Sequence, residues 1–366
     1  MKKIKIYIFS PYSTIGGDTL SLSRLIDNLS EKKYDISFIS LRKSKITEYN
    51  LSRKVKFINL RTSRTIFSIF KIRNLIKSDL NRKYSKYIFI SNQNFGNIVS
   101  IFIVKGFKKI KLILIERNHL DEFKYQKLFK NFFIKHLIKI FYKHADLIIG
   151  ISKKLSKDLS IYVKKKVVTV YNPAFDKKIL KLSRQRVNFL PKNNLILSVG
   201  RFENQKDPFT LLKAFKIVSK KIDTSLLMIG YGSMLNKINE YIKNNSLSNK
   251  VTILKNVKNA YPYYKFSSIF VVTSKYEGFC NVIVEAAMFK VPIISSKCNS
   301  GPSEILMNGK GGDFFKIGDY KKLSKIIIKR LKYKNKTKTK ILIKNLDRFS
   351  VEKNVNKFKK IFKQLV

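Results

Sequence analysis

The chain has 366 residues, 44% of them hydrophobic, and a formal net charge of +54 at pH 7. This length predicts two domains, and the hydrophobic fraction excludes an intrinsically disordered chain. The charge indicates an anionic partner, either nucleic acid or a membrane surface, or a compositional bias toward lysine; no apolar run approaches the roughly 20 residues of a membrane-spanning helix.

The cysteines and the N-terminal segment indicate a cytoplasmic protein. Cys280 and Cys298 have neither metal-ligand nor disulfide spacing and suit a reducing compartment. The opening "MKKIKIYIFSPYS" has no extended apolar stretch and no small-residue cleavage site, so it predicts a first strand rather than a signal peptide.

The first half of the chain alternates short strands with helical segments. "IKIYIFS" is followed by the glycine turn "PYSTIGGD", the amphipathic helix "TLSLSRLIDNLSEKKYD" and the strand "ISFISL", which together predict a βαβ unit and a parallel sheet. Further strands are expected at "KYIFISN", "IKLILIE", "ADLIIGIS" and "VVTVYN". These elements predict an α/β, doubly wound domain over residues 1–172.

The same pattern restarts after a polar stretch that contains two prolines. "LILSVGR" predicts a strand and "KDPFTLLKAFKIVSKK" a helix, and more strands follow at "SLLMIG", "VTILKN", "SIFVVTS" and "VPIISS". We expect a second Rossmann-like domain over residues 173–348, and a last helix over 349–366 that packs back on the first domain. Two such domains facing each other would leave a cleft at the carboxyl ends of their strands.

Two glutamates, Glu277 and Glu285, lie eight residues apart in an otherwise apolar and small-residue run. The first falls in a loop after a strand, and the second one turn into a helix that opens near Asn281, a good N-cap residue. Amide groups at a helix N-terminus bind anions, and Gly278 lets backbone approach a ligand. This arrangement suits a sugar nucleotide; the alternative is a capping carboxylate beside an exposed loop glutamate.

The motifs, taken in order, resemble the family 4 glycosyltransferases. "SVGRFENQKDPFTLLKAF", "YEGFCNVIVEAAMFKVPIIS" and "SGPSEIL" match the second domain of that family, and "IGGD", "ERNHLDEF", "ADLIIGISKKLSKDL" and "VYNP" match the first. The resemblance implies the GT-B architecture, with two facing Rossmann-like domains, and a retaining enzyme. It also implies transfer of a hexose or N-acetylhexosamine from a UDP-sugar to a surface-glycan acceptor.

The resemblance assigns roles in the second domain. Arg201 and Lys206 would hold the donor diphosphate, Glu285 the ribose hydroxyls, and Glu277 would stabilise positive charge at the anomeric carbon of the sugar. From composition alone, the two cations would be interpreted as surface residues, and only their position in the motif favours the donor site. The remaining donor-binding residues are expected to be Gly278, Phe279, Cys280, Asn281, Val282, Gly230, Asn256 and Val257. Cys280 stands where many relatives have glycine or proline, and is read as a small packed side chain or a reactive thiol.

In the first domain, Gly16 and Gly17 are expected to end the first strand and let a phosphate or the acceptor approach; a glycine turn without contacts is the alternative. His119 resembles the family histidine near the donor sugar, although Asn118 or Arg117 shifts that register by one or two positions. Neither an Asp-x-Asp motif at a strand end nor a His/Cys cluster occurs, so we expect no metal and no cofactor besides the UDP-sugar donor.

The segment "KYQKLFKNFFIKHLIKIFYKH", residues 124–144, is apolar and carries six lysines. Such a helix can lie on an anionic membrane, which would suit a polyprenyl-diphosphate-linked or other lipid-linked acceptor; a packed helix with its lysines in solvent is the alternative. We therefore expect peripheral attachment to the inner face of the cytoplasmic membrane.

Other functions explain single features. A nucleic-acid binder would account for the charge, but lysine is spread over the entire chain. A glycoside hydrolase needs its two carboxylates on opposite faces of a sugar, and a glutamate on a phosphate-binding helix is poorly placed for that role. A sugar-nucleotide epimerase of the same fold stays open, distinguished by its independence of an acceptor, as does a non-catalytic polyanion-binding relative.

Overall fold

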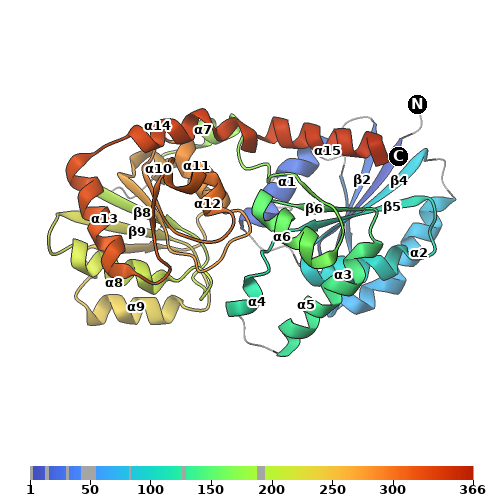
Figure 1. Ribbon diagram of the computed structural model, residues 1–366, viewed down its shortest axis with the longest axis horizontal. Coiled ribbons are helices and arrows are strands. Elements are labelled where there is room, and N and C mark those ends of the chain that lie inside the picture. Colours follow the sequence, from blue (N-terminus) through green and yellow to red (C-terminus); the bar gives the residue numbers. More distant parts are fainter. Residues whose placement is uncertain are drawn as a thin grey trace. The chain divides into compact units, whose positions relative to one another are not determined.

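The computed structural model describes residues 3–12, 16–29, 33–42, 55–81, 84–125, 129–187 and 194–365. The chain forms two compact units (Figure 1). Unit 1 comprises Met1–Pro173 together with Val351–Val366, and unit 2 comprises Ala174–Ser350. The sequence predicts domain boundaries after residues 172 and 348, and the structure divides the two units after residues 173 and 350.

Unit 1 is built on a seven-stranded parallel sheet in the order β3-β2-β1-β4-β5-β6-β7. Its strands are β1 (Ile4–Phe9), β2 (Tyr34–Ser40), β3 (Val55–Asn59), β4 (Lys86–Asn92), β5 (Ile110–Glu116), β6 (Leu147–Gly150) and β7 (Val167–Thr169). The strand order reverses between β1 and β4, as in a doubly wound fold. The edge strand β3 has no counterpart among the predicted strands.

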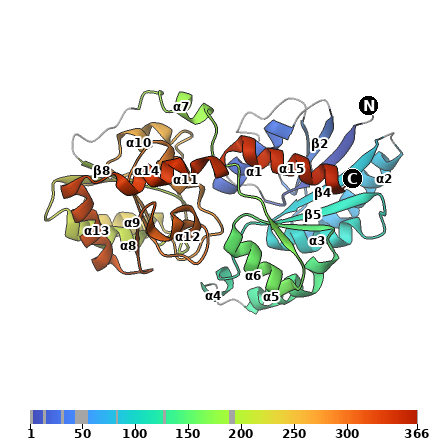
Figure 2. The same cartoon turned by 45° about the horizontal axis from the view of Figure 1, so that its top comes forward.

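Helices cover both faces of the unit 1 sheet. They are α1 (Gly17–Leu29), η2 (Thr65–Phe67), α2 (Ser68–Leu80), α3 (Asn94–Val104), α4 (Glu122–Tyr125), α5 (Phe129–Phe141), η3 (Tyr142–His144), α6 (Lys153–Val163) and α15 (Val351–Leu365). Helix α1 packs against α15, whereas α2, α3, α5 and α6 pack one beside the next on the other face (Figures 1 and 2). Right-handed crossovers on either side of the strand reversal require this division.

The last helix, α15, belongs to unit 1 although unit 2 separates it from the rest in sequence. Its buried residues Val351, Val355, Phe358 and Phe362 recur every three to four positions and form one apolar stripe. The ring of Phe362 meets that of Tyr34 edge-on at 6.1 Å between centroids. Burial of each phenylalanine contributes roughly 2–3 kcal/mol to the stability of unit 1.

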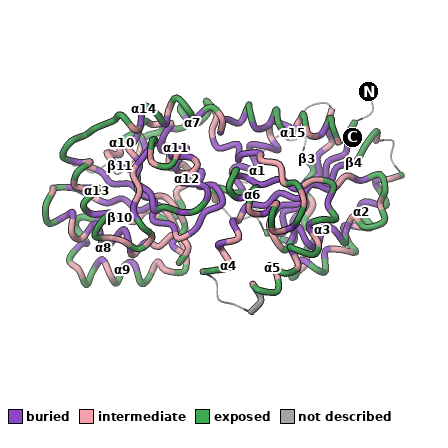
Figure 3. The backbone as a smooth tube through the Cα atoms, in the orientation of Figure 1, coloured by how far each residue is buried: buried purple, intermediate pink, exposed green. Residues whose placement is uncertain are grey.

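Unit 2 is built on a six-stranded parallel sheet in the order β10-β9-β8-β11-β12-β13. Its strands are β8 (Asn194–Val199), β9 (Thr224–Ile229), β10 (Val251–Leu254), β11 (Ile269–Val272), β12 (Ile293–Ser296) and β13 (Asp313–Phe315). Its helices are α7 (Lys178–Leu182), α8 (Pro208–Val218), α9 (Leu235–Asn244), α10 (Tyr261–Phe266), α11 (Asn281–Met288), α12 (Pro302–Ile305), η4 (Met307–Gly309), α13 (Tyr320–Tyr333), α14 (Thr337–Lys344) and η5 (Leu346–Phe349). The strands of both sheets are mostly buried, as expected for parallel sheets covered on both faces (Figure 3).

The start of α8 shows why the sequence "KDPFT" places a helix here. Asp207 is the N-cap, and its carboxylate accepts hydrogen bonds from the backbone N–H and the hydroxyl of Thr210. Pro208 occupies the first helical position, where its missing N–H costs nothing. This fixed start sets the short loop between β8 and α8, which carries Arg201 and Lys206.

Candidate active site

The two glutamates lie on the loop and helix that follow β11 in unit 2. Both residues are buried, with only 6% of their surface exposed, so the alternative of an exposed loop glutamate is wrong. The prediction that Asn281 caps α11 is also wrong, because Asn281 is the first helical residue. The N-cap is Cys280, whose φ of 84° turns the chain into the helix, and its side chain makes no capping hydrogen bond.

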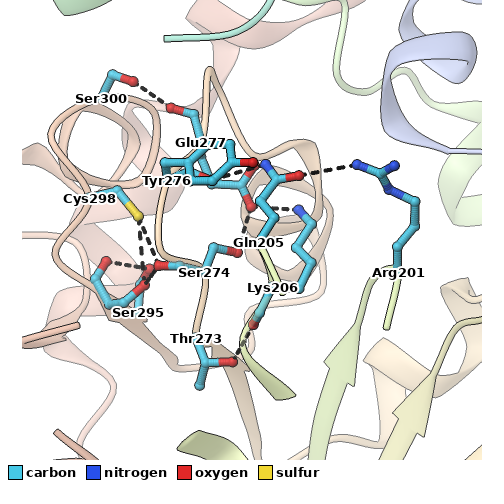
Figure 4. A network of polar contacts seen from close by, with 11 residues as sticks. Arg201, Gln205, Lys206, Thr273, Ser274, Tyr276, Glu277, Ser295, Cys298 and Ser300 are labelled. Atoms are coloured by element: carbon cyan, nitrogen blue, oxygen red, sulfur yellow. Dashed lines mark hydrogen bonds and ion pairs between the residues drawn. The ribbon is translucent and has the colours of Figure 1, made fainter. Parts of the chain in front are cut away.

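Glu277 is held by residues from two neighbouring strand ends (Figure 4). Its Oε1 atom accepts from Lys206 Nζ at 2.5 Å and from Ser274 Oγ at 2.6 Å. Lys206 follows β8 and Glu277 follows β11, which are paired in the sheet, so the fold brings together two residues 71 positions apart. The backbone oxygen of Glu277 accepts a further hydrogen bond from the Ser300 hydroxyl.

Lys206 stays charged because of this pairing. Burial by itself disfavours the ammonium form, but the Glu277 carboxylate outweighs that effect, so the pKa of Lys206 lies above its ordinary value. Its side chain is 24% exposed, whereas that of Glu277 is 7% exposed. The pair is thus a preformed cation and anion at the carboxyl edge of the sheet, with the cation on the more accessible side.

Arg201 is exposed and is tethered to this cluster through Gln205. Its Nη2 atom donates to Gln205 Oε1 at 3.1 Å, and Gln205 Nε2 donates to the backbone oxygen of Tyr276 at 3.1 Å (Figure 4). Since the amide oxygen carries no net charge, Arg201 is positioned without being neutralised. Gln205, Ser274 and Ser300 were not among the predicted site residues; their places inside the matched motifs were the available signal.

A pocket with about 370 Å³ of empty volume, part of it open to solvent, adjoins these residues within unit 2. The ends of β8, β9 and β11, the loop after β8 and the start of α11 line it: Ser198, Val199, Gly200, Arg201, Phe202, Lys206, Pro208, Met228, Val271, Val272, Thr273, Ser274 and Val282. Of the predicted donor-binding residues, the pocket wall therefore includes Arg201, Lys206 and Val282.

Glu285 lies on α11 and is anchored by a tyrosine of α10. The Tyr264 hydroxyl donates to Glu285 Oε2 at 3.2 Å. Burial and the carboxylate hold the pKa of the Tyr264 phenol well above its ordinary value, so the phenol stays a donor. The Tyr264 ring stacks on Phe289 at 5.9 Å between centroids, which fixes the partner of the glutamate by aromatic packing.

Cys280 does not have the environment of a reactive thiol. It is buried, and burial together with the Glu277 carboxylate raises the pKa of its thiol well above the ordinary value. Because the thiolate is the reactive form, the structure favours the small packed side chain over the reactive thiol. Its neighbour Phe279 is also buried and packs edge-on against Phe349.

The other predicted donor-binding residues lie in loops of unit 2. Gly278 is buried in the loop before α11, while Asn256 and Val257 follow β10, with Asn256 exposed at a φ of 53°. Gly230 has a packing reason to be glycine, because an added Cβ would lie 1.9 Å from the carbonyl oxygen of Gly200. That reason holds whether or not Gly230 contacts a ligand.

His119 is buried in unit 1 between two carboxylates. Its Nε2 atom lies 2.9 Å from Asp158 Oδ2, and its Nδ1 atom accepts from the backbone N–H of Asp121 at 3.2 Å. The Asp121 carboxylate oxygen Oδ2 also lies 3.1 Å from Nδ1. Both ring nitrogens are therefore oriented by protein partners.

Gly16 and Gly17 do not end the first strand, contrary to the prediction. β1 ends at Phe9, and Gly17 is the first residue of α1. A Cβ added to Gly16 would meet nothing within 4 Å, so its neighbours do not require a glycine. Within the part of the chain that the structure describes, no group of three or more His, Cys, Asp or Glu side chains is arranged to hold a metal ion.

Solved structures define the class of protein that has this fold. Sucrose-phosphate synthase from Thermosynechococcus elongatus matches with a TM-score of 0.84 and 18% identity over 99% of both chains. Anabaena Alr3699/HepE, solved in complex with UDP and glucose, matches with a TM-score of 0.80 and 16% identity over 99% of this chain and 100% of that one. The fold is that of the GT-B glycosyltransferases.

The sequence identifies the family within that class. The family model for glycosyl transferases group 1 matches residues 181–348. The uncharacterized glycosyltransferase MJ1059 of Methanocaldococcus jannaschii is 30% identical over 79% of this chain and 74% of its own. The amylovoran biosynthesis glycosyltransferase AmsD of Erwinia amylovora is 27% identical over 80% of this chain and 81% of its own. The chain belongs to the group 1 glycosyltransferases, which confirms the resemblance found in its motifs.

A third relative is named for its acceptor. It is the N-acetylgalactosamine-N,N'-diacetylbacillosaminyl-diphospho-undecaprenol 4-alpha-N-acetylgalactosaminyltransferase of Campylobacter jejuni, 25% identical over 75% of this chain and 75% of its own.

Proposed function

We propose that this glycosyltransferase moves a hexose or N-acetylhexosamine from a UDP-sugar to a lipid-linked glycan acceptor in bacterial surface polysaccharide synthesis, with retention and without a metal ion. The observation that carries the proposal is that Lys206, which lines the unit 2 pocket together with Arg201, is paired with the buried carboxylate of Glu277. A relative named for a diphospho-undecaprenol acceptor and a fold neighbour solved with UDP and glucose support the two substrates.

The pocket residues supply the charges that such a transfer needs. When the bond between the anomeric carbon and UDP breaks, negative charge grows on the diphosphate and positive charge on the sugar. Arg201, whose partner is a neutral amide, and Lys206, on the accessible side of its pair, would take the diphosphate. Glu277 keeps its hydrogen bond from Ser274 and would face the developing positive charge. The acceptor hydroxyl oxygen would then bond to the same face of that carbon, while its proton passes to the departing diphosphate.

Calorimetric titration of the full chain with UDP and GDP in EDTA tests the donor. We expect UDP to bind, and the Arg201→Ala and Glu285→Ala variants to bind it at least about tenfold more weakly. The control is Lys329→Ala, which removes an exposed lysine from α13 and tests whether charge alone explains binding. Equal loss in all three variants, or no nucleotide binding by the wild type, would refute the donor site.

Turnover separates the catalytic roles from donor binding. We assign catalytic roles to Glu277 and His119, so Glu277→Gln and His119→Ala should lower sugar transfer by about a hundredfold or more while UDP binding stays within a few-fold. The readout is UDP release from UDP-sugars with and without a lipid-linked acceptor. Conversion of the UDP-sugar without any acceptor would instead favour the epimerase alternative.

We propose peripheral membrane attachment through α5. Phe132 and Phe133 on this helix are 73% and 57% exposed, and lysines flank them. The predicted helix over 124–144 is divided into α4, α5 and η3, with residues 126–128 outside the described part. No helix in the described ranges has both the length and the apolar character to cross a bilayer.

Cosedimentation with vesicles tests this attachment. We expect binding to vesicles with anionic lipid, weakened several-fold by Phe132→Ser/Phe133→Ser. The matched control is Phe70→Ser, which removes a phenylalanine that is 78% exposed on α2. Equal effects of both changes would refute a specific role for α5.

A further inference from the structure

A buried arginine lies at the carboxyl edge of the unit 1 sheet. Arg117 directly follows β5, and only 5% of its surface is exposed. The adjacent strand β4 ends at Asn92, whose amide lies 3.5 Å from the Ser10 hydroxyl that follows β1. Since β1 and β4 flank the reversal of strand order, Arg117 lies beside the position where open α/β sheets bind ligands.

Neutral amides hold the guanidinium in place. Arg117 Nε donates to Asn92 Oδ1, and Nη1 donates to Asn172 Oδ1 at 2.9 Å. Two strand ends thus orient the side chain from different sides. The N–H groups on Nη2 make no hydrogen bond to any residue that the structure describes, so one corner of the fork is left for another acceptor.

The partners of Arg117 differ from those of three other buried or half-buried cations in the described residues. Lys5, which is 2% exposed, lies 2.8 Å from the Asp35 carboxylate, and Lys206 pairs with Glu277. Arg330 likewise contacts the Asp313 carboxylate. No such ion pair to Arg117 occurs among the described residues. Because an uncompensated buried charge is costly, this arrangement is typical of a cation that a ligand completes.

The acid nearest in sequence does not serve as that partner. Glu116 Oε1 accepts from the backbone N–H groups of Arg117 and Asn118, and its Oε2 accepts from the Tyr142 hydroxyl at 2.7 Å. Burial lowers the pKa of Arg117, an effect that the charges of Asp18 and Glu116 only partly offset. Glu116 therefore fixes the backbone that follows β5, while the Arg117 guanidinium donates to the side-chain amides of Asn92 and Asn172.

We propose that Arg117, oriented by Asn92 and Asn172, is a binding site in unit 1 for an oxyanion, a phosphate or a carboxylate, of the acceptor substrate. The assignment to the acceptor rests on the proposed function; the anion site itself does not. A guanidinium held in a fork recognises two oxygen atoms of one anionic group, which gives orientation as well as affinity. The site would set which acceptors are used, since an acceptor without a charge at this point would lose the contact.

The test places a carboxylate of the protein itself beside the Arg117 guanidinium. Asn92→Asp keeps the size of the side chain and places a carboxylate on Arg117 Nε, so it should neutralise the guanidinium without removing it. The control is Asn81→Asp, which adds the same charge to an exposed residue of unit 1 at the end of α2. Both variants are made in the full chain, with ¹⁵N-labelled arginine and nuclear magnetic resonance as the readout. The Nε–Hε signal of Arg117 is identified by its absence in Arg117→Gln.

Inorganic diphosphate and L-malate are titrated separately, and UDP binding is measured beside them. We expect the Arg117 signal to shift saturably with at least one anion, about tenfold more weakly in Asn92→Asp and unchanged in Asn81→Asp. A response to diphosphate alone assigns phosphate acceptors, and a response to malate alone assigns carboxylate acceptors. No saturable shift with either anion, or equal titrations in both variants, would overturn the inference. UDP binding without an Arg117 response refutes only the anion site. An Arg117 response without UDP binding refutes only the donor site.

Discussion

The Lys206–Glu277 pair allows a quantitative test of how the unit 2 site is built. The perturbation is Lys206→Met, which keeps the length of the side chain but leaves the Glu277 carboxylate buried with Ser274 as its remaining Oε1 partner. Removing one member of a fully buried pair costs about 3–5 kcal/mol. Because 24% of the Lys206 side chain is exposed, we expect roughly 2–3 kcal/mol here.

The assay is thermal unfolding followed by circular dichroism, with the transition of unit 2 identified by its response to UDP. The expected loss corresponds to a decrease of about 4–12 °C in the midpoint for a unit of this size. The double variant Lys206→Met/Glu277→Gln should recover at least half of the loss, because it no longer buries an unpaired charge. The raised pKa of Lys206 means that the pair stabilises the fold below pH 10.5, the ordinary lysine value, and that this contribution is lost as the pH rises through the folded-state pKa.

The control is Lys275→Met in the loop that carries Glu277, where the lysine donates to the neutral amide oxygen of Asn204. It should change stability by no more than about 0.5 kcal/mol. If Lys206→Met costs no more than this control, or if the double variant fails to recover, the carboxylate is not held by the lysine and the reasoning about the preformed site is refuted.

Three further predictions concern single positions. Burial raises the pKa of Glu116 from 4.5 to about 7, so the free energy of unfolding of the wild type should fall by up to about 3 kcal/mol as the pH rises from 4.5 to 7. Thermal unfolding of Glu116→Gln should lack this loss, and parallel pH profiles of the two proteins would contradict the prediction. Gly230→Ala should destabilise unit 2 by about 1–3 kcal/mol because its Cβ meets the Gly200 oxygen, whereas Gly16→Ala, with open space around it, should be neutral or stabilising in the same measurement. Phe362→Ala on α15 should cost about 3–5 kcal/mol in unit 1, and proteolysis that leaves unit 1 as resistant as before would argue against its burial at 0% exposure.

The repeated pattern of strand, turn and helix was sufficient to predict both sheets from the sequence, but not their edges. Four of the five residues of β3 are exposed or half-buried, and β13 has only three residues, so neither carries a strong apolar signal. The capping of α11 was assigned to Asn281 from residue preference, yet Cys280 occupies that place in a left-handed conformation. Local propensity does not indicate such a conformation for a cysteine.

The site was predictable where charge and spacing coincide, as at Glu277, Glu285, Arg201 and Lys206. Gln205, Ser274 and Ser300 escaped prediction because amides and hydroxyls are common and their partners depend on which strand ends meet. Arg117 had been noted only as a shift of register around His119. Its hydrogen bonding to two amides in place of an ion pair is a property of the folded sheet edge, which no sequence pattern expresses.

The return of α15 to unit 1 has a consequence for how the chain matures on the ribosome. All residues of unit 2 have been made once residue 350 is added, whereas unit 1, although its first part is translated earlier, lacks its α15 stripe until residues 351–365 leave the exit tunnel. The N-terminal half must therefore wait, with the apolar surface that Phe358 and Phe362 later cover still open to chaperones. Loss of α15 from the chain would thus harm the beginning of the polypeptide more than its middle.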